Sequence, residues 1–94
     1  MQLPIVFRNR DNSIVGWVPV SNIDIESIAH ACAAEARHLA AIGCRSWTAH
    51  CPEIHAWLFG RPGDGIIAEY EAGTYDRGHW LPESPEQWLR LWQS

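Results

Sequence analysis

The histidine and cysteine side chains offer the widest range of chemistry in this sequence. Imidazole nitrogen and thiolate sulfur are the ligands that zinc prefers. The set comprises His30, Cys32, His38, Cys44, His50, Cys51, His55 and His79. It contains no Cys-x-x-Cys or His-x-x-x-His pair, so we interpret it as structural or incidental and predict no metal ligand. A surface site built from His50, His55 and a third ligand is the alternative.

Local geometry favours the structural interpretation. Cys32 falls on the apolar face of a predicted helix, where a small buried thiol is ordinary. His50 and Cys51 are neighbours in a predicted strand, so their side chains should point to opposite faces. His30 and His38 lie about 80° apart around the predicted helix, which is too loose for a preformed pair of ligands.

Signals for catalysis are weak. A thiol of Cys44 or Cys51 beside a histidine and an aspartate would be the chemistry of a hydrolase, which we keep as a third hypothesis. The sequence has no nucleophile-elbow pattern and no phosphate-binding glycine loop, and residues 61–65 are interpreted as a plain turn. Glu69 and Glu71 share one face of a predicted strand, where exposed acids usually mark the solvated side of a sheet. We therefore predict no catalytic residue, no cofactor and no enzymatic activity.

A binding role is the leading prediction. Two nearby stretches combine acids with aromatic residues, and aromatic side chains dominate the energetics of protein interfaces. The predicted partner-binding residues are Glu69, Tyr70, Glu71, Tyr75, Asp76 and Trp80. Aromatic anchors mixed with carboxylates would suit a basic surface on a protein partner.

The net charge agrees with such a partner. The 94 residues carry a formal charge of −4. All of the excess lies in residues 53–94, which hold Glu53, Asp64, Glu69, Glu71, Asp76, Glu83 and Glu86 against Arg61, Arg77 and Arg90. A negative surface repels phosphate backbones, which disfavours direct nucleic-acid binding. Solubility alone also explains a mild negative charge, and this is the alternative interpretation.

Length and composition indicate one small domain over residues 1–94. No stretch approaches the roughly 20 apolar residues of a membrane helix. Residues 1–20 lack the basic start and long apolar run of a signal peptide. Three cysteines are an odd number, which argues against a disulfide framework and for reduced thiols in the cytoplasm. Six tryptophans exceed the obvious needs of a small core, so one or two of them could lie on a binding surface.

The first half of the chain predicts a hairpin followed by a helix. Residues 4–8 and 14–20 are rich in β-branched and aromatic side chains, and the turn-forming residues 9–13 separate them. Residues 24–42 place apolar side chains at spacings of three and four, which predicts the one long helix. Asp24 is the expected N-cap, with Ser21 and Asn22 as the alternatives, and Gly43 is the expected left-handed residue after the helix. Glu26, His30, Ala33 and Arg37 are predicted to form its outer face.

The second half predicts further strands and a short helix. Residues 45–51 alternate and are interpreted as a strand, and so are residues 65–72. Residues 54–59 are ambiguous, and we favour a strand over a short helix that begins at Pro52 and stops at Gly60. Residues 73–83 read as irregular.

The C-terminal segment carries the clearest local signal. Residues 84–87 form a capping box with proline at the first helical position. Trp88, Leu91 and Trp92 then make an apolar stripe. A helix of this length is too short to stand alone, so its tryptophans should dock on the home domain. A homodimer through this helix is the alternative.

One stretch of the sequence resembles a known class of proteins. Residues 57–65, Trp-Leu-Phe-Gly-Arg-Pro-Gly-Asp-Gly, are similar to the aromatic helix end and Pro-Gly turn of a type I anti-CRISPR protein from a phage. The resemblance implies a helix at residues 54–59. It also implies a function class, that of small acidic inhibitors, and it designates no site residue.

These observations combine into one prediction. The fold class is α+β, with an N-terminal β-hairpin, one long helix packed on a small antiparallel sheet and a short C-terminal helix. The predicted function is a non-enzymatic protein-binding protein, an inhibitor from a phage or mobile element that blocks a basic surface of its target. A metal-binding or small-ligand module that uses the histidines and cysteines is the alternative.

Overall fold

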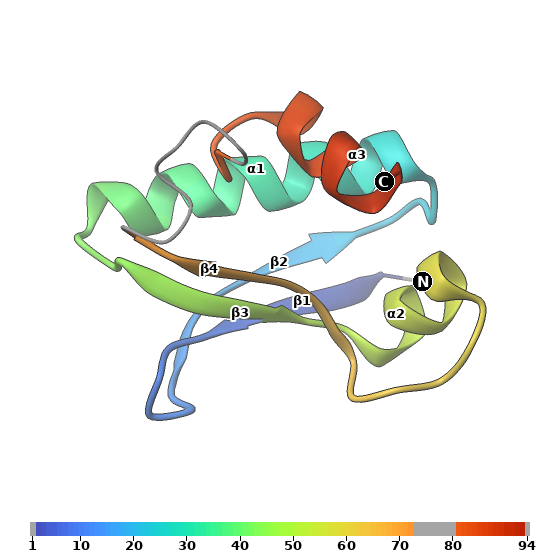
Figure 1. Ribbon diagram of the computed structural model, residues 1–94, viewed down its shortest axis with the longest axis horizontal. Helices are drawn as coiled ribbons and strands as arrows, with labels where there is room; N and C mark the ends of the chain where they lie inside the picture. The colour runs from blue at the N-terminus through green and yellow to red at the C-terminus, as the bar shows by residue number, and fades with distance from the viewer. Residues whose placement is uncertain (1, 73–80, 94) are drawn as a thin grey trace.

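A computed structural model describes residues 2–72 and 81–93 of the protein. The predicted α+β fold class is confirmed (Figure 1). A hairpin comes first and forms part of an antiparallel sheet, and the long helix that follows packs on this sheet. The elements in chain order are β1 (Leu3–Arg8), β2 (Ile14–Val20), α1 (Ile25–Ala41), β3 (Ser46–His50), α2 (Pro52–Phe59), β4 (Ile66–Glu71) and α3 (Pro85–Gln93). Within the described residues, no helix has the length and apolar character needed to cross a membrane.

The sheet has the strand order β2-β1-β3-β4, and every neighbouring pair is antiparallel. β1 and β2 form the predicted hairpin, whose turn is held by the Asn9 side chain accepting from the amides of Asp11 and Ser13. β3 pairs with β1 instead of β2, so the first strand of the chain becomes a central strand. The hairpin's second strand, β2, and the last strand, β4, are therefore the two edges of the sheet.

Helix α1 begins where its capping signal predicts. The Asp24 carboxylate accepts from the amide of Ser27 at 2.8 Å and from its hydroxyl at 2.8 Å. Gly43 follows the helix with a φ of 85°, the left-handed conformation that glycine adopts without steric cost. The apolar side of α1 packs on the sheet with Ile28, Cys32 and Leu39 fully buried. Both predicted ends of the long helix are thus confirmed.

The predicted outer face of α1 needs one correction. Ala33 was placed on that face, yet it is fully buried. The reason is that α3 packs against α1 and covers a second side of the helix (Figure 1). The guanidinium of Arg37 donates to the carbonyl oxygen of Glu83 at 2.8 Å, which ties α1 to the segment that precedes α3.

Substituting the N-cap of α1 should lower stability in a pH-dependent way. Hydrogen bonds from the Ser27 amide and hydroxyl hold the pKa of the Asp24 carboxyl below its ordinary value. Such a group stabilises the fold above its unfolded pKa of about 3.9, and the contribution is lost as the pH falls through the lower folded pKa. We expect Asp24→Ala to lower the melting temperature by roughly 5 °C at neutral pH, measured by circular dichroism.

Asp24→Asn is the matched control for this experiment. Asparagine keeps an oxygen that can accept the Ser27 amide, but it does not titrate. The difference in melting temperature between the native protein and Asp24→Ala should therefore shrink at acidic pH, whereas that between Asp24→Asn and Asp24→Ala should persist. A native-to-alanine difference that is independent of pH would contradict the assigned cap.

Residues 54–59 are helical, so the favoured prediction of a strand is wrong. They belong to α2, with Pro52 in its first turn and Gly60 at its end in the left-handed conformation, φ 71°. The amide of Cys51 donates to the carbonyl of Gly65 at 2.8 Å. This bond brings the end of β3 directly to the start of β4, which leaves the intervening residues outside the sheet. The helix buries Ile54 in the core at this end of the molecule.

Helix α3 docks on its own domain, as predicted. Trp88 is fully buried, and its ring stacks on that of Trp47 with 5.7 Å between centroids and 4° between planes. The Trp92 indole nitrogen donates to the carbonyl of Ile67 in β4 at 3.0 Å. The expected capping box differs in detail, because the Ser84 hydroxyl donates to Glu86, the second helical residue. A homodimer through α3 stays a prediction.

Candidate functional site

The two faces of the sheet are covered differently. Helices α1 and α3 lie on the same side of the strands, and no described helix crosses the opposite side (Figure 1). Because side chains alternate along each strand, the register assigns residues to the second side. We call this side the open face, and it carries the side chains of Val6, Arg8, Trp17, Ser46, Thr48, His50, Ile66, Glu69 and Glu71.

Strand register places one polar row across the open face. Arg8 in β1 lies opposite Thr48 in β3, and Thr48 lies opposite Glu69 in β4. Strands in a sheet are about 4.8 Å apart, so Arg8 and Glu69 are separated by the width of two strand spacings. The Arg8 guanidinium donates to the carbonyl of Asn12 at 3.0 Å, which turns it toward the hairpin loop and away from Glu69.

A second pair of charges flanks this row. Glu71 lies opposite Ser46 on the open face and forms an ion pair with Arg10, which comes from the turn of the hairpin. The Arg10 side chain is 72% exposed and that of Glu71 49%. An ion pair this exposed contributes little to stability, on the order of 0–1 kcal/mol, so its carboxylate remains available for exchange with another cation.

A cavity of about 200 Å³ opens at this end of the open face. Its lining residues come from the hairpin and from both C-terminal strands: Arg8, Asn9, Arg10, Ser46, Trp47, Thr48, Glu69, Tyr70 and Glu71. Sites for drug-sized ligands and cofactors usually measure about 300–1,000 Å³. The cavity is therefore better matched to one long side chain than to a nucleotide or another cofactor.

The structure brings three of the predicted site residues, Glu69, Tyr70 and Glu71, to the cavity. Glu69 and Glu71 both point to the open face and both line the cavity. Tyr70 lies between them in sequence, so its ring points to the other face, half-buried at 5.6 Å from the Trp47 ring. Tyr75, Asp76 and Trp80 lie outside the described residues.

The arginines of this site, Arg8 and Arg10, are not among the residues predicted from the sequence. Arg8 is 61 positions from Glu69, counted as 69 minus 8, and Arg10 is 61 positions from Glu71, counted as 71 minus 10. Only the pairing of β3 with β1 brings these arginines near the two glutamates. Ser46 and Thr48 share one face of β3, and both residues border the cavity. The site therefore mixes both signs of charge.

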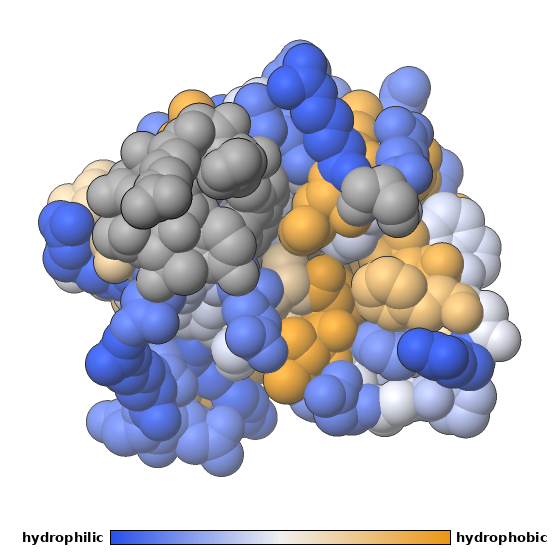
Figure 2. Space-filling model, viewed as in Figure 1, coloured by the Kyte–Doolittle hydropathy of each residue, from blue (hydrophilic) through white to orange (hydrophobic). Residues whose placement is uncertain are grey.

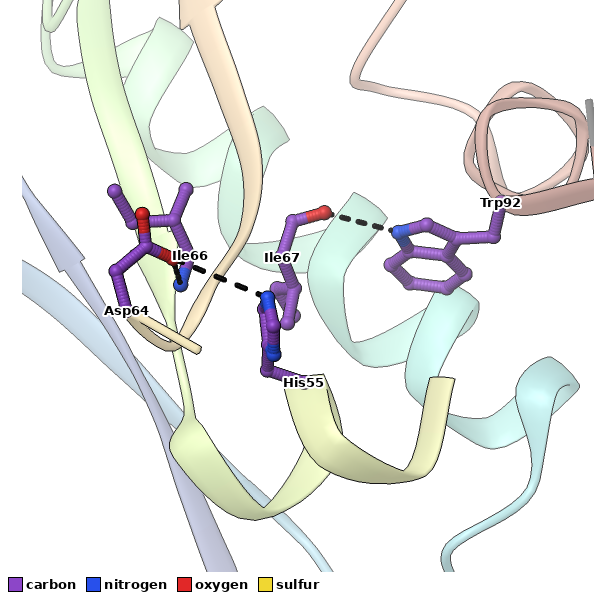
Figure 3. A network of polar contacts seen from close by, with 5 residues as sticks. All are labelled: His55, Asp64, Ile66, Ile67 and Trp92. Atoms are coloured by element: carbon purple, nitrogen blue, oxygen red, sulfur yellow. Dashed lines mark hydrogen bonds and ion pairs between the residues drawn. The ribbon is translucent and has the colours of Figure 1, made fainter. Parts of the chain in front are cut away.

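The described histidine and cysteine side chains do not converge on one site, and His79 lies outside the described residues. No group of three histidine, cysteine, aspartate or glutamate residues could hold a metal ion within residues 2–72 and 81–93. His55 packs on the Phe59 ring at 4.8 Å, and its Nε2 is 3.9 Å from Asp64 Oδ1 (Figure 3). The same aspartate oxygen accepts the Ile66 amide at 3.0 Å, which closes the turn before β4.

The buried thiols are poor nucleophiles. Burial raises the pKa of Cys32, which is fully enclosed between α1 and the sheet. Burial also raises the pKa of Cys51, whose thiol donates to a carboxylate oxygen of Glu53 at 3.5 Å. Because the thiolate is the reactive form, both sulfurs are kept in the unreactive state at neutral pH.

A separate apolar surface lies beside α2 and α3. Hydrophobic atoms gather between the positions of these two helices on the face shown in Figure 2. The exposed large side chains on these helices are Trp57, Phe59 and Leu91, with exposures of 48%, 45% and 37%.

Comparison with known proteins gives no match, whether with protein-family models, with curated proteins or with solved structures. The resemblance of residues 57–65 to phage anti-CRISPR proteins therefore stays a prediction from the sequence.

Proposed function

We propose that this protein is a non-enzymatic protein-binding protein that docks its open face against a basic surface of a target protein. Its proposed role is that of an inhibitor that is encoded by a phage or mobile element and acts in the cytoplasm. The three free cysteines are compatible with that compartment, where thiols stay reduced.

The observation that carries the proposal is the cavity beside Glu69. Its volume of about 200 Å³ suits one arginine or lysine side chain. The Glu69 carboxylate and the hydroxyls of Ser46 and Thr48 supply acceptors for such a cation at the cavity wall. A charged hydrogen bond in a partly desolvated hollow is stronger than one on a flat surface, so this is where a partner would be anchored.

The arginines of the open face support orientation of the partner. Arg10 already pairs with Glu71, and a guanidinium from the partner could share or replace that contact. Arg8 would meet an acid on the partner. Alternating charges across an interface suppress wrong registers more than they add affinity, because each misplaced pair brings like charges together.

Charge reversal at Glu69 tests the proposal. We expect Glu69→Arg to weaken the complex with the target at least tenfold, or about 1.4 kcal/mol, because it places a cation where the partner's cation should bind. The target is first identified by capture from the native host and mass spectrometry, and its affinity for each purified variant is then measured by biolayer interferometry. Circular dichroism verifies that the variants are folded.

Glu83→Arg is the matched control, since it changes the net charge equally at an exposed position outside the open face. It should leave the affinity within about twofold at physiological salt, because distant surface charges are screened. If Glu69→Arg and Glu83→Arg weaken the complex equally, only net charge matters and the open face is not the interface.

A further inference from the structure

The backbone groups at the two edges of the sheet, β4 and β2, have different surroundings. At the β4 edge, the Trp92 indole of α3 donates to the carbonyl of Ile67, so a side chain occupies that edge. At the other edge, no described strand pairs with the outer side of β2. The sequence of β2, Ile-Val-Gly-Trp-Val-Pro-Val, carries no charge that would discourage pairing with another strand. Its Trp17 side chain is 59% exposed.

Two opposed prolines reveal which backbone groups of β2 face outward. Pro4 lies opposite Pro19, and neither residue has an amide hydrogen to donate across the pair. This pair must therefore be a non-hydrogen-bonded one, and the alternation of an antiparallel ladder makes the pair of Val6 and Trp17 non-hydrogen-bonded too. The amide and carbonyl of Trp17 and the carbonyl of Pro19 consequently point away from β1.

The same alternation extends to β3. Val6 lies opposite His50 of β3, and because its amide and carbonyl point away from β2, they are directed toward β3. Trp17 thus directs its amide and carbonyl to an edge where none of the described strands pairs with them, beside a large exposed indole.

We propose that β2 pairs antiparallel with β2 of a second copy of this chain, about a two-fold axis that passes beside Trp17. Trp17 then faces Trp17 of the second copy, and the two residues exchange both backbone hydrogen bonds. In this register Pro19 lies opposite Val15 of the second copy. Val15 is the extra residue where the register of β2 against β1 shifts, so the alternation does not fix the direction of its amide. The missing proline amide removes one donor on each side.

Self-pairing matches the side chains as well as the backbone. Directly opposed residues in a hydrogen-bonded pair have Cα atoms about 5.5 Å apart, which brings the two exposed indoles into contact. Because β2 carries no charge, it has no charge pattern that would select a different peptide. Pairing about a two-fold axis gives each copy the same backbone hydrogen bonds. The sheets of the two copies would continue into one another, with both open faces on the same side.

The oligomeric state of the full chain tests the proposal. We expect sedimentation equilibrium between about 1 and 500 μM to show a reversible monomer–dimer exchange. Trp17→Lys should raise the dimer dissociation constant at least tenfold, because two cations would meet at the axis. Trp57→Lys is the matched control, since it replaces another exposed tryptophan, in α2, and it should leave the constant within about twofold.

A second measurement needs no mutation. Exchange of the Trp17 amide with solvent should slow as concentration rises, because only the dimer gives this amide a partner. The Val18 amide, which belongs to the hydrogen-bonded pair with Ile5, should be protected at every concentration. A chain that stays monomeric up to about 500 μM would overturn the proposal. So would a dimer that Trp17→Lys leaves intact, or one in which the Trp17 amide exchanges at an unchanged rate. None of these results depends on the proposed target.

Discussion

Replacing Trp88 by alanine should cost about 3–5 kcal/mol of unfolding free energy, the largest effect expected of a single substitution here. Trp88 has no exposed surface. Its ring stacks on that of Trp47 in β3, and its centroid is 5.4 Å from that of Trp92. Removing the ring therefore opens a cavity between α3 and the sheet. The indole nitrogen also donates to the carbonyl of Pro82 at 2.6 Å, and Pro82 is itself buried. Losing this bond leaves a buried acceptor without its donor.

Urea denaturation followed by circular dichroism measures this effect. A domain of this size has a total stability of about 5–15 kcal/mol, so the variant could approach the limit of folding. Trp88→Phe separates the two contributions, because it keeps an aromatic ring on Trp47 and removes only the indole donor and one ring. Trp57→Ala is the control for loss of a tryptophan, and its 48% exposure predicts a cost within about 1 kcal/mol. Equal costs at positions 57 and 88 would contradict the buried stack.

Substituting Gly65 by alanine should cost about 2–3 kcal/mol. Gly65 has a φ of 84°, which disfavours any residue with a Cβ atom. An added Cβ would also lie 2.9 Å from Cε1 of His50 and 3.2 Å from Cγ of Pro52. Because the Gly65 carbonyl receives the Cys51 amide, a shift of this residue would disturb the junction between β3 and β4.

Gly43 provides an internal reference for the backbone term. Its φ of 85° is almost the same, but an added Cβ would meet nothing within 4 Å. Gly43→Ala should therefore cost only the left-handed penalty, about 1 kcal/mol. The difference between the two variants, measured by chemical denaturation, isolates the contacts with His50 and Pro52. A combined Gly65→Ala, His50→Ala variant should recover part of it, and equal costs for Gly43→Ala and Gly65→Ala would argue against the close approach.

The segment from residue 52 to 59 shows where sequence reasoning stops. Proline and glycine at its ends predict a helix, while its β-branched and aromatic content fits a strand. Six to eight residues are too few for periodicity to decide. The deciding interaction is the bond between Cys51 and Gly65, which joins residues 14 positions apart, counted as 65 minus 51. Because β4 begins directly after that junction, residues 52–59 cannot pair within the sheet, and they form a short helix in the connection between β3 and β4.

The candidate site divides in the same way. Alternation along β4 predicted that Glu69 and Glu71 share a face, and the register confirms it. Whether any cation stands near them depends on which strand pairs with β3. Because that strand is β1, Arg8 and Arg10 enter the site from the opposite end of the chain. Charge counts along the sequence indicated an acidic segment, whereas the folded surface combines both signs.

The sequence by itself determined the features that depend on neighbours within a few positions: the hairpin, the Asp24 cap, the length of α1 and the docking stripe of α3. Each follows from side-chain period, capping chemistry or backbone preference, which act over one or two turns of chain. Only the tertiary structure decided the order of the strands, the burial of Ala33 beneath α3 and the cavity on the open face. These depend on contacts between segments that are far apart in the sequence, and no local period or capping signal specifies such contacts.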